Sequence, residues 1–262
     1  MNLKRRVKKQ LKKRGLWGSK IVQFVGLGLL ALATVAVLAF ALREPQPVAA
    51  ENAPATSPKP IATTAAAAAP KVAFMGDSYT AGTGSTSPAN RWTTKTASAL
   101  GWEELNFGQG GSGFTGGGGP GTDGKERLSY PDMIPAVAAA KPDMVVIATA
   151  GNDFNRGPSA FEPAAAAFFP ALRAALPDAK IVVVSTFWRG PGAHKDLAAL
   201  NDSLRSGAAA VNGTYLDLGD AFQAAQGKGW LASDQIHPND AGHAELAAEV
   251  AKAFSATPAA HG

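Results

Sequence analysis

One histidine of this sequence is well placed to act as a general base. Asp234 and His237 lie three residues apart, close enough for the carboxylate to hold the imidazole. A base that works near neutral pH is most often a histidine, and it needs such an orienting partner. The chain has only four histidines; His261 lies in a terminal tail, and His243 falls in a helical stretch that favours a structural role.

A serine follows the first short apolar run after residue 70. Ser78 lies in Gly76-Asp77-Ser78-Tyr79, directly after residues 72–75. We expect it on a sharp strand-to-helix turn, with its hydroxyl exposed and its backbone N–H free to face a developing oxyanion. An ordinary serine that caps the next helix would give the same local pattern.

Two further segments offer hydrogen-bond donors. Residues 106–113 are rich in glycine, which lets the backbone approach a ligand and present its N–H groups. Asn152, in Gly151-Asn152-Asp153, carries an amide that can point at an oxyanion, although asparagine is also common in turns after strands. Nucleophile, donors and base pair together form the constellation that oxyanion chemistry requires.

Three other kinds of site are less consistent with these residues. Gly108, Gly110 and Gly113 spell a dinucleotide-binding pattern, but residues 114–120 cannot open a helix. Residues 119–125 match most of a phosphate-binding loop, but Glu126 stands where a Ser or Thr is needed, so residues 116–124 are interpreted as a flexible loop. A metal site from Asp234, His237 and His243 lacks further ligands, because the chain has no cysteine and no other suitable histidine. We expect neither metal nor cofactor.

The elements that must position these residues alternate between strand and helix. The alternation predicts an α/β fold with a parallel sheet of about five strands and right-handed crossovers. Reactive groups in such sheets lie just past the carboxyl ends of the strands. The expected strands are 72–75, 104–107, 144–149, 181–186 and 214–218, and the expected helices are 90–100, 130–140, 160–176, 193–210 and 239–254.

The chain of 262 residues divides into segments of different composition. Residues 1–20 are a basic tail, 21–42 an uncharged apolar run long enough to span a membrane, and 43–70 a linker rich in Pro and Ala. The positive-inside rule places the tail in the cytoplasm and the rest outside. If Val48-Ala49-Ala50 is instead a cleavage site, the remainder is secreted. A folded domain over 71–256 and a short tail over 257–262 complete the chain.

The net charge of +5 comes from the first segments alone. Ten of the 25 Lys and Arg residues lie in 1–43, with none of the 20 acidic residues, so the rest of the chain carries 15 basic against 20 acidic groups. Residues 44–262 therefore have a net charge of −5, and the folded part within them would repel nucleic acid.

The four segments together resemble the SGNH hydrolase superfamily, the GDSL-like lipases and esterases. The blocks are Gly76-Asp77-Ser78-Tyr79, Asn106-x-Gly108-x-x-Gly111, Gly151-Asn152-Asp153 and Asp234-x-x-His237-Pro238. The resemblance implies a flavodoxin-like three-layer α/β/α sandwich and metal-free ester hydrolysis. It implies Ser78 as nucleophile, His237 as base and Asp234 as orienter. The implied oxyanion hole is the N–H of Ser78, the N–H of Gly111 and the Asn152 side chain, with Gly110 an alternative to Gly111.

An exported enzyme of this kind would act on acyl esters of small molecules, lipids or envelope glycans, with short or acetyl acyl groups favoured. Transfer of the acyl group to a glycan hydroxyl, or an anchored binding module without activity, are the alternatives. Several aromatic residues near the predicted site could line an acyl pocket or belong to the core: Phe114, Phe154, Phe187, Trp188 and Trp230.

Overall fold

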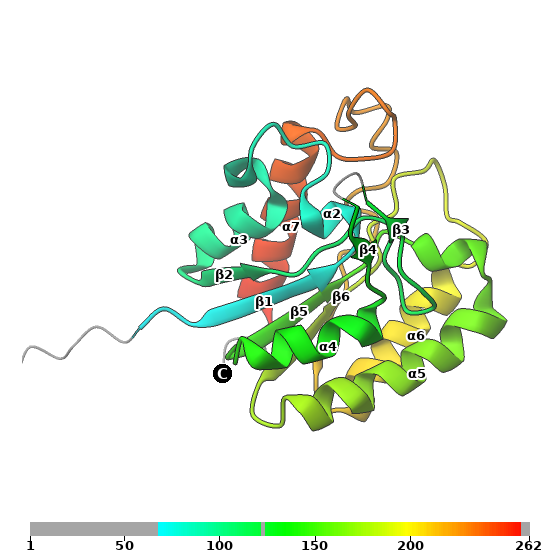
Figure 1. Cartoon of the computed structure of the whole chain (residues 1–262). Coiled ribbons are helices and arrows are strands. Elements are labelled where there is room, and N and C mark those ends of the chain that lie inside the picture. Colours follow the sequence, from blue (N-terminus) through cyan, green and yellow to red (C-terminus); the bar gives the residue numbers. More distant parts are fainter. Residues whose placement is uncertain (1–67, 122–123, 258–262) are drawn as a thin grey trace, which may run out of the picture. The chain divides into compact units, whose positions relative to one another are not determined.

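The computed structural model describes residues 68–121 and 124–257. Its centre is a parallel sheet of five strands in the order β2-β1-β5-β6-β7 (Figure 1). The strands are β1 (Lys71–Gly76), β2 (Glu103–Asn106), β5 (Met144–Ala148), β6 (Lys180–Val184) and β7 (Thr214–Leu216). The predicted fold class is therefore confirmed for the sheet, and the five expected strands are all present.

Helices cover both faces of the sheet (Figure 1). On one face lie α3 (Trp92–Leu100) and α7 (Asp240–Ala256); on the other lie α4 (Tyr130–Ala139), α5 (Pro158–Ala175) and α6 (Leu197–Ala210). Shorter elements are α2 (Ser78–Ala81), η1 (Pro88–Asn90), η2 (Asn152–Asn155), β3 (Gly119–Pro120) and β4 (Glu126–Arg127).

Alternate residues of each central strand enter different halves of the core. Ala73 and Met75 of β1 pack beneath α4 and α5, whereas Val72 and Phe74 face α3 and α7. The Phe74 ring meets Trp92 of α3 edge to face at a centroid distance of 5.4 Å. Because both faces are buried, the strands carry continuous apolar runs, which is why they could be recognised from the sequence.

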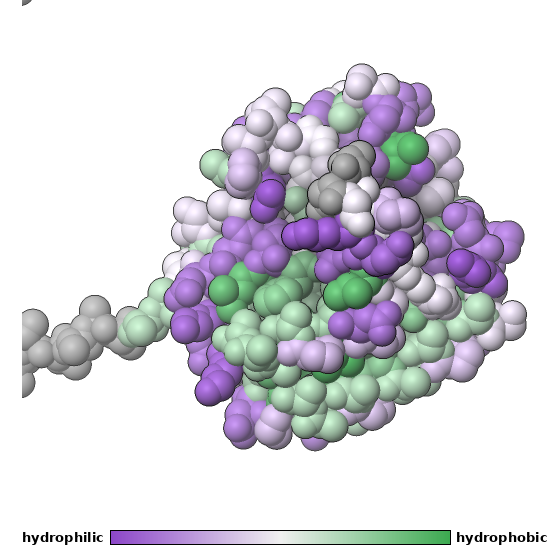
Figure 2. Space-filling model, viewed as in Figure 1, coloured by the Kyte–Doolittle hydropathy of each residue, from purple (hydrophilic) through white to green (hydrophobic). Residues whose placement is uncertain are grey.

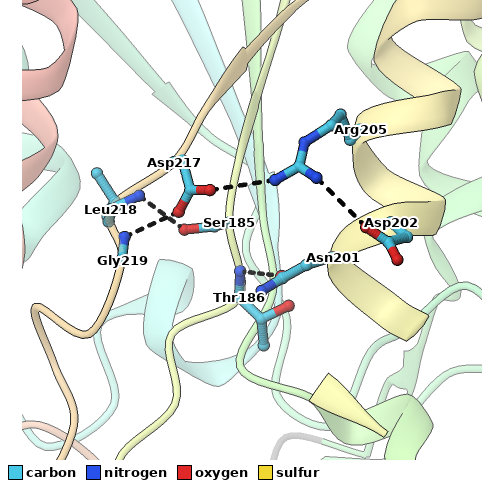
Figure 3. A network of polar contacts seen from close by, with 8 residues as sticks. All are labelled: Ser185, Thr186, Asn201, Asp202, Arg205, Asp217, Leu218 and Gly219. Carbon is cyan, nitrogen blue, oxygen red and sulfur yellow. Dashed lines mark hydrogen bonds and ion pairs between the residues drawn. The ribbon is translucent and has the colours of Figure 1, made fainter. Parts of the chain in front are cut away.

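Polar side chains determine where several strands end and where α7 begins. Asn239 caps α7 by accepting a hydrogen bond from the N–H of Gly242 at 3.0 Å. Strand β6 ends at Val184, two residues before the expected end, because the N–H of Thr186 donates to the Asn201 side chain of α6 at 2.9 Å (Figure 3). Beside it, the N–H of Leu218 donates to Ser185 Oγ at 2.9 Å, and β7 ends at Leu216 (Figure 3).

Two expectations about local structure need correction. The helix expected from residue 193 begins at Leu197, because His194 Nδ1 accepts a hydrogen bond from the N–H of Asp196 at 3.1 Å and holds the preceding turn. The segment 116–124, expected as a flexible loop, contains strand β3, which pairs in antiparallel fashion with β4 just after that segment, so that Gly119 faces Arg127.

The outer surface of α4 and α5 is weakly hydrophobic, which appears as pale green in Figure 2. Among residues 68–121 and 124–257, no helix combines the length and hydrophobicity needed to cross a membrane. The predicted basic tail and apolar run lie outside the described residues, as do nearly all of the linker and of the C-terminal tail.

Candidate active site

Ser78 occupies the position expected for it, at the C-terminal edge of the sheet. It is the first residue of α2, directly after β1 and Asp77. Its backbone N–H and its hydroxyl donate no hydrogen bond within the described residues. The tight turn depends on Gly76, since a Cβ there would lie 2.2 Å from Thr80 Oγ1 and 2.5 Å from the Ala148 carbonyl oxygen.

Asp77 is fully buried and links the ends of two strands. One carboxylate oxygen accepts from the N–H of Tyr79 at 3.0 Å, which caps α2, and the other accepts from the N–H of Ala150, after β5, at 2.6 Å. Burial raises the pKa of Asp77 to about 6, against a lowering by these two backbone hydrogen bonds and by His237. Asp77 had no predicted role, although an aspartate before a helix is a typical cap.

The Asp234 carboxylate holds the His237 imidazole. Nδ1 of His237 lies 2.7 Å from one Asp234 oxygen, and the other oxygen accepts from the N–H groups of Ile236 at 2.9 Å and His237 at 3.0 Å. The hydrogen bond from the His237 side chain is the main cause that lowers the pKa of Asp234 to about 2. Asp234 is therefore ionised at neutral pH, and its contact to Nδ1 leaves Nε2 as the nitrogen that can take up a proton.

The loop that carries His237 packs against the turn that follows Ser78. The Tyr79 hydroxyl donates to the Ile236 carbonyl at 2.6 Å, and the Tyr79 and His237 rings lie 6.0 Å apart between centroids. Backbone contact between Gly84 and Pro238 brings the same segments together, because a Cβ on Gly84 would lie 2.2 Å from the Pro238 oxygen. Within the described residues no hydrogen bond joins Ser78 Oγ to the imidazole.

The glycine-rich segment and Asn152 also meet at this edge. Asn152 Nδ2 donates to the Ser112 carbonyl at 2.9 Å, which uses one of its two N–H groups and leaves the second open. Gly111 has a left-handed backbone with φ of +78°, and a Cβ there would lie 2.6 Å from Gly118 Cα. A side chain at Gly111 is therefore excluded by both conformation and contact.

Asp153 fixes the shape of the glycine-rich segment, a role that the sequence analysis missed. The carboxylate is buried and accepts from the N–H of Phe114 at 3.0 Å, the N–H of Thr115 at 3.0 Å and the Thr115 hydroxyl at 2.7 Å. A Cβ on Gly113 would lie 2.7 Å from the same carboxylate. Its position directly after Asn152 was the only signal in the sequence.

A cavity of about 370 Å³ opens beside Gly111 and Asn152. Its lining comes from two segments, within 111–117 and 152–156. Gly110 does not line it, so the cavity favours Gly111 as the glycine that faces a bound ester.

The aromatic residues near the site do not line that cavity. Phe114 and Phe187 are buried in the two halves of the core. Phe154 and Trp188 are half-buried and form a cluster with His194, which stacks on Phe154 at a centroid distance of 4.1 Å. Trp230 is half-buried and stacks on Phe222.

His243 is not near a set of metal ligands. It is buried in α7, where Nδ1 accepts from the N–H of Trp92 at 3.3 Å and Nε2 lies 3.2 Å from the Thr83 carbonyl oxygen. Burial lowers its pKa. In the described part of the chain, no group of three or more His, Cys, Asp or Glu side chains is placed to hold a metal ion.

A comparison with known families identifies this arrangement. The family model described as "GDSL-like Lipase/Acylhydrolase family" matches residues 74–245, more than half of the chain. The chain belongs to the GDSL-like lipase/acylhydrolase family. This GDSL-like chain is a carboxylic ester hydrolase of the SGNH type, as the sequence motifs predicted. No curated protein matches it.

Solved structures share the fold of this GDSL-like hydrolase at low identity. An aryl esterase from M. smegmatis is 18% identical, with a TM-score of 0.53 over 72% of this chain and 99% of that one. A carbohydrate acetylesterase from Sinorhizobium meliloti is 18% identical, with a TM-score of 0.52 over 71% of this chain and 99% of that one. A family two carbohydrate esterase from Clostridium thermocellum is 19% identical, with a TM-score of 0.54 over 72% of this chain and 64% of that one.

Proposed function

We propose that this protein is an exported serine esterase that hydrolyses short acyl esters through an acyl-enzyme. Ser78 is the nucleophile, His237 the general base and Asp234 its orienter. The observation that carries the proposal is the 2.7 Å contact between Asp234 and His237 Nδ1. The loop that carries this pair is bound by the hydroxyl of Tyr79, the residue directly after Ser78. The contact to Nδ1 leaves Nε2 available at the edge of the sheet where Ser78 lies.

The reaction begins when the Ser78 hydroxyl attacks the ester carbonyl carbon and its proton passes to His237 Nε2. The carbonyl electrons move onto oxygen, and the resulting oxyanion is stabilised by the N–H of Ser78, the N–H of Gly111 and the second N–H of Asn152 Nδ2. Each such donor contributes roughly 3–4 kcal/mol to transition-state stabilisation. The intermediate collapses, the C–O bond to the alcohol breaks, and the departing alkoxide takes the proton from His237.

Water completes the cycle by the same chemistry. It gives a proton to His237 Nε2 as it attacks the acyl-Ser78 carbonyl, and the second tetrahedral intermediate releases the carboxylic acid and returns the proton to Ser78 Oγ. Ser78 Oγ and the His237 imidazole share no hydrogen bond in the structure. This is compatible with the reaction steps above, because such contacts often tighten only when substrate is bound.

The nucleophile can be tested with a fluorophosphonate probe, which labels activated serines covalently. We expect the wild-type chain to be labelled and to turn over an aryl acetate, and Ser78→Ala to lose both. Ser85→Ala is the matched control, because Ser85 lies nearby and its hydroxyl is occupied by the Gly82 carbonyl at 2.6 Å. Full turnover by Ser78→Ala, or labelling of neither protein, would contradict the assignment.

Export rests on the first 42 residues, whose basic segment precedes an apolar run. We place residues 1–20 in the cytoplasm, 21–42 in the membrane and the esterase domain outside. Protease added to intact cells that express the full chain should digest the domain, while a cytoplasmic marker protein stays intact. A domain that is digested only after lysis would contradict this location.

A further inference from the structure

The cavity beside Gly111 and Asn152 is lined by polar groups and glycines, which sets it apart from an acyl-chain pocket. Thr115 contributes the only methyl group among its side chains. A fatty acyl chain needs aliphatic or aromatic walls, because its burial is driven by the removal of apolar surface from water. The cavity therefore suits a polar part of the substrate.

Three of the hydrogen-bond acceptor groups at this cavity are already occupied. The Gly113 carbonyl accepts from the N–H of Tyr130 at 2.9 Å, and the Gly116 carbonyl accepts from the N–H of Gly113 at 2.9 Å. The Asp153 carboxylate, which also lines the cavity, takes three donors from Phe114 and Thr115. These three groups are therefore not available to a ligand that brings donors, whereas the side-chain oxygens of Asn152 and Asn155 accept no hydrogen bond from a described residue.

Several donors at the cavity have no partner within the described residues. The backbone N–H groups of Gly116 and Gly117 donate no hydrogen bond there, and neither does that of Gly111, which the proposed reaction uses for the oxyanion. Arg156 is exposed at the end of η2, where its backbone N–H donates to the Asp153 carbonyl at 2.9 Å. Its guanidinium makes no ion pair or hydrogen bond to a described residue, yet the side chain lines the cavity.

The positive charge of Arg156, together with the open backbone donors, favours a ligand that is rich in acceptors and negatively charged. Guanidinium and converging backbone N–H groups are the groups that proteins use for carboxylates and phosphates. Residues 44–262, which include the folded domain, carry a net charge of −5, so their overall field does not attract anions. An anionic group would be recognised here by a local contact.

We propose that this cavity binds an anionic group of the ester substrate, a carboxylate or a phosphate, and that Arg156 determines this specificity. The proposal rests on the proposed function, because it takes the ester carbonyl to lie at Gly111 and Asn152. It makes the preferred substrate a short acyl ester of an acidic molecule, such as a sugar acid or a sugar phosphate.

The test compares substrates that differ only in charge. Aryl acetates that carry a ring carboxylate, a ring phosphate or a neutral carboxamide are assayed with wild type, Arg156→Gln and Arg156→Lys. We expect wild type to prefer at least one anionic ester over the carboxamide. Arg156→Gln should reduce the ratio of kcat/KM for that ester to kcat/KM for the carboxamide by about tenfold to a hundredfold, mainly through KM, because one charge-assisted contact is lost.

Arg156→Lys keeps the charge but not the planar fork, so it should recover part of the lost preference. Arg205→Gln is the control and should leave the ratio at its wild-type value. It removes an exposed arginine of α6 that is paired with Asp202 and Asp217 (Figure 3). The preferred anion identifies the ligand as carboxylate or phosphate.

Three outcomes would overturn the inference: no preference for either anion in wild type, an equal loss on anionic and neutral esters in Arg156→Gln, or the same change of ratio in Arg205→Gln. Ser78→Ala separates this failure from failure of the proposed function. If Ser78→Ala abolishes turnover while Arg156→Gln keeps the wild-type ratio, only the anion site is wrong.

Discussion

Replacement of Asp153 by asparagine tests whether one buried carboxylate holds the oxyanion donors in place. The carboxylate receives three hydrogen bonds from the segment that also contains Gly111. Asparagine has nearly the same shape, but only one of its two terminal atoms is an acceptor. If that oxygen keeps both bonds to Thr115, the amide NH₂ faces the N–H of Phe114, and two donors then oppose each other in a buried site.

The magnitude follows from what is lost and what is left unpaired. One hydrogen bond to a charged group contributes about 1.5–3 kcal/mol, and a buried unsatisfied donor costs about 1–3 kcal/mol. We expect Asp153→Asn to lower the free energy of unfolding by about 3 kcal/mol. A shift of Gly111 by about 1 Å relative to Ser78 would lower kcat by about a hundredfold.

Thr115→Val gives a graded control. It removes only the 2.7 Å bond from the Thr115 hydroxyl and keeps both backbone N–H bonds to Asp153. We expect a loss of about 1 kcal/mol in stability and a much smaller change in kcat. Urea unfolding and kcat for an aryl acetate measure both variants. If Asp153→Asn matches wild type in stability and kcat, the segment keeps its shape without the carboxylate and the reasoning is refuted.

Two further substitutions test the other contacts at the edge of the sheet. The pKa of Asp77 is raised from 3.8 to about 6, so wild type should lose about 3 kcal/mol of stability as the pH rises through this range, and Asp77→Asn should lack this loss. Urea unfolding at pH 4 and pH 7.5 measures it, and a stability difference between the two proteins that does not change with pH would contradict it. Tyr79→Phe removes the 2.6 Å bond to the Ile236 carbonyl and should cost about 1 kcal/mol of stability and lower kcat several-fold. An unchanged kcat would show that the loop of His237 is held without this bond.

The strands could be predicted because local pattern and tertiary environment agree. Residues 144–148 and 181–184 are apolar throughout, and both strands are covered by helices on either side. Asp234 and His237 are close in sequence, so spacing alone predicted their contact. The rule that functional residues follow the carboxyl ends of parallel strands then placed Ser78 and Asn152 at the same edge.

The contacts that shape the site could not be predicted, because they join residues far apart in the chain. The bond from Tyr79 to Ile236 spans 157 positions, and the bonds from Phe114 and Thr115 to Asp153 span 39 and 38. The glycine content of residues 108–119 indicated that their backbone can approach a ligand, but it did not show which backbone N–H groups stay open. That depends on the partners of each carbonyl and carboxylate, which only the folded chain supplies.

The distribution of satisfied and open polar groups is itself an argument for the position of the site. Asp77 and Asp153 are buried and each accepts hydrogen bonds from two backbone N–H groups, and each lies beside a residue proposed to act on the substrate. Ser78 N–H, one N–H of Asn152 and Nε2 of His237 make no hydrogen bond to the described residues. Buried carboxylates thus hold the backbone, and the groups that would contact an ester are left unpaired. Such preorganised, unpaired donors are what oxyanion stabilisation requires, since they need not reorganise when charge develops.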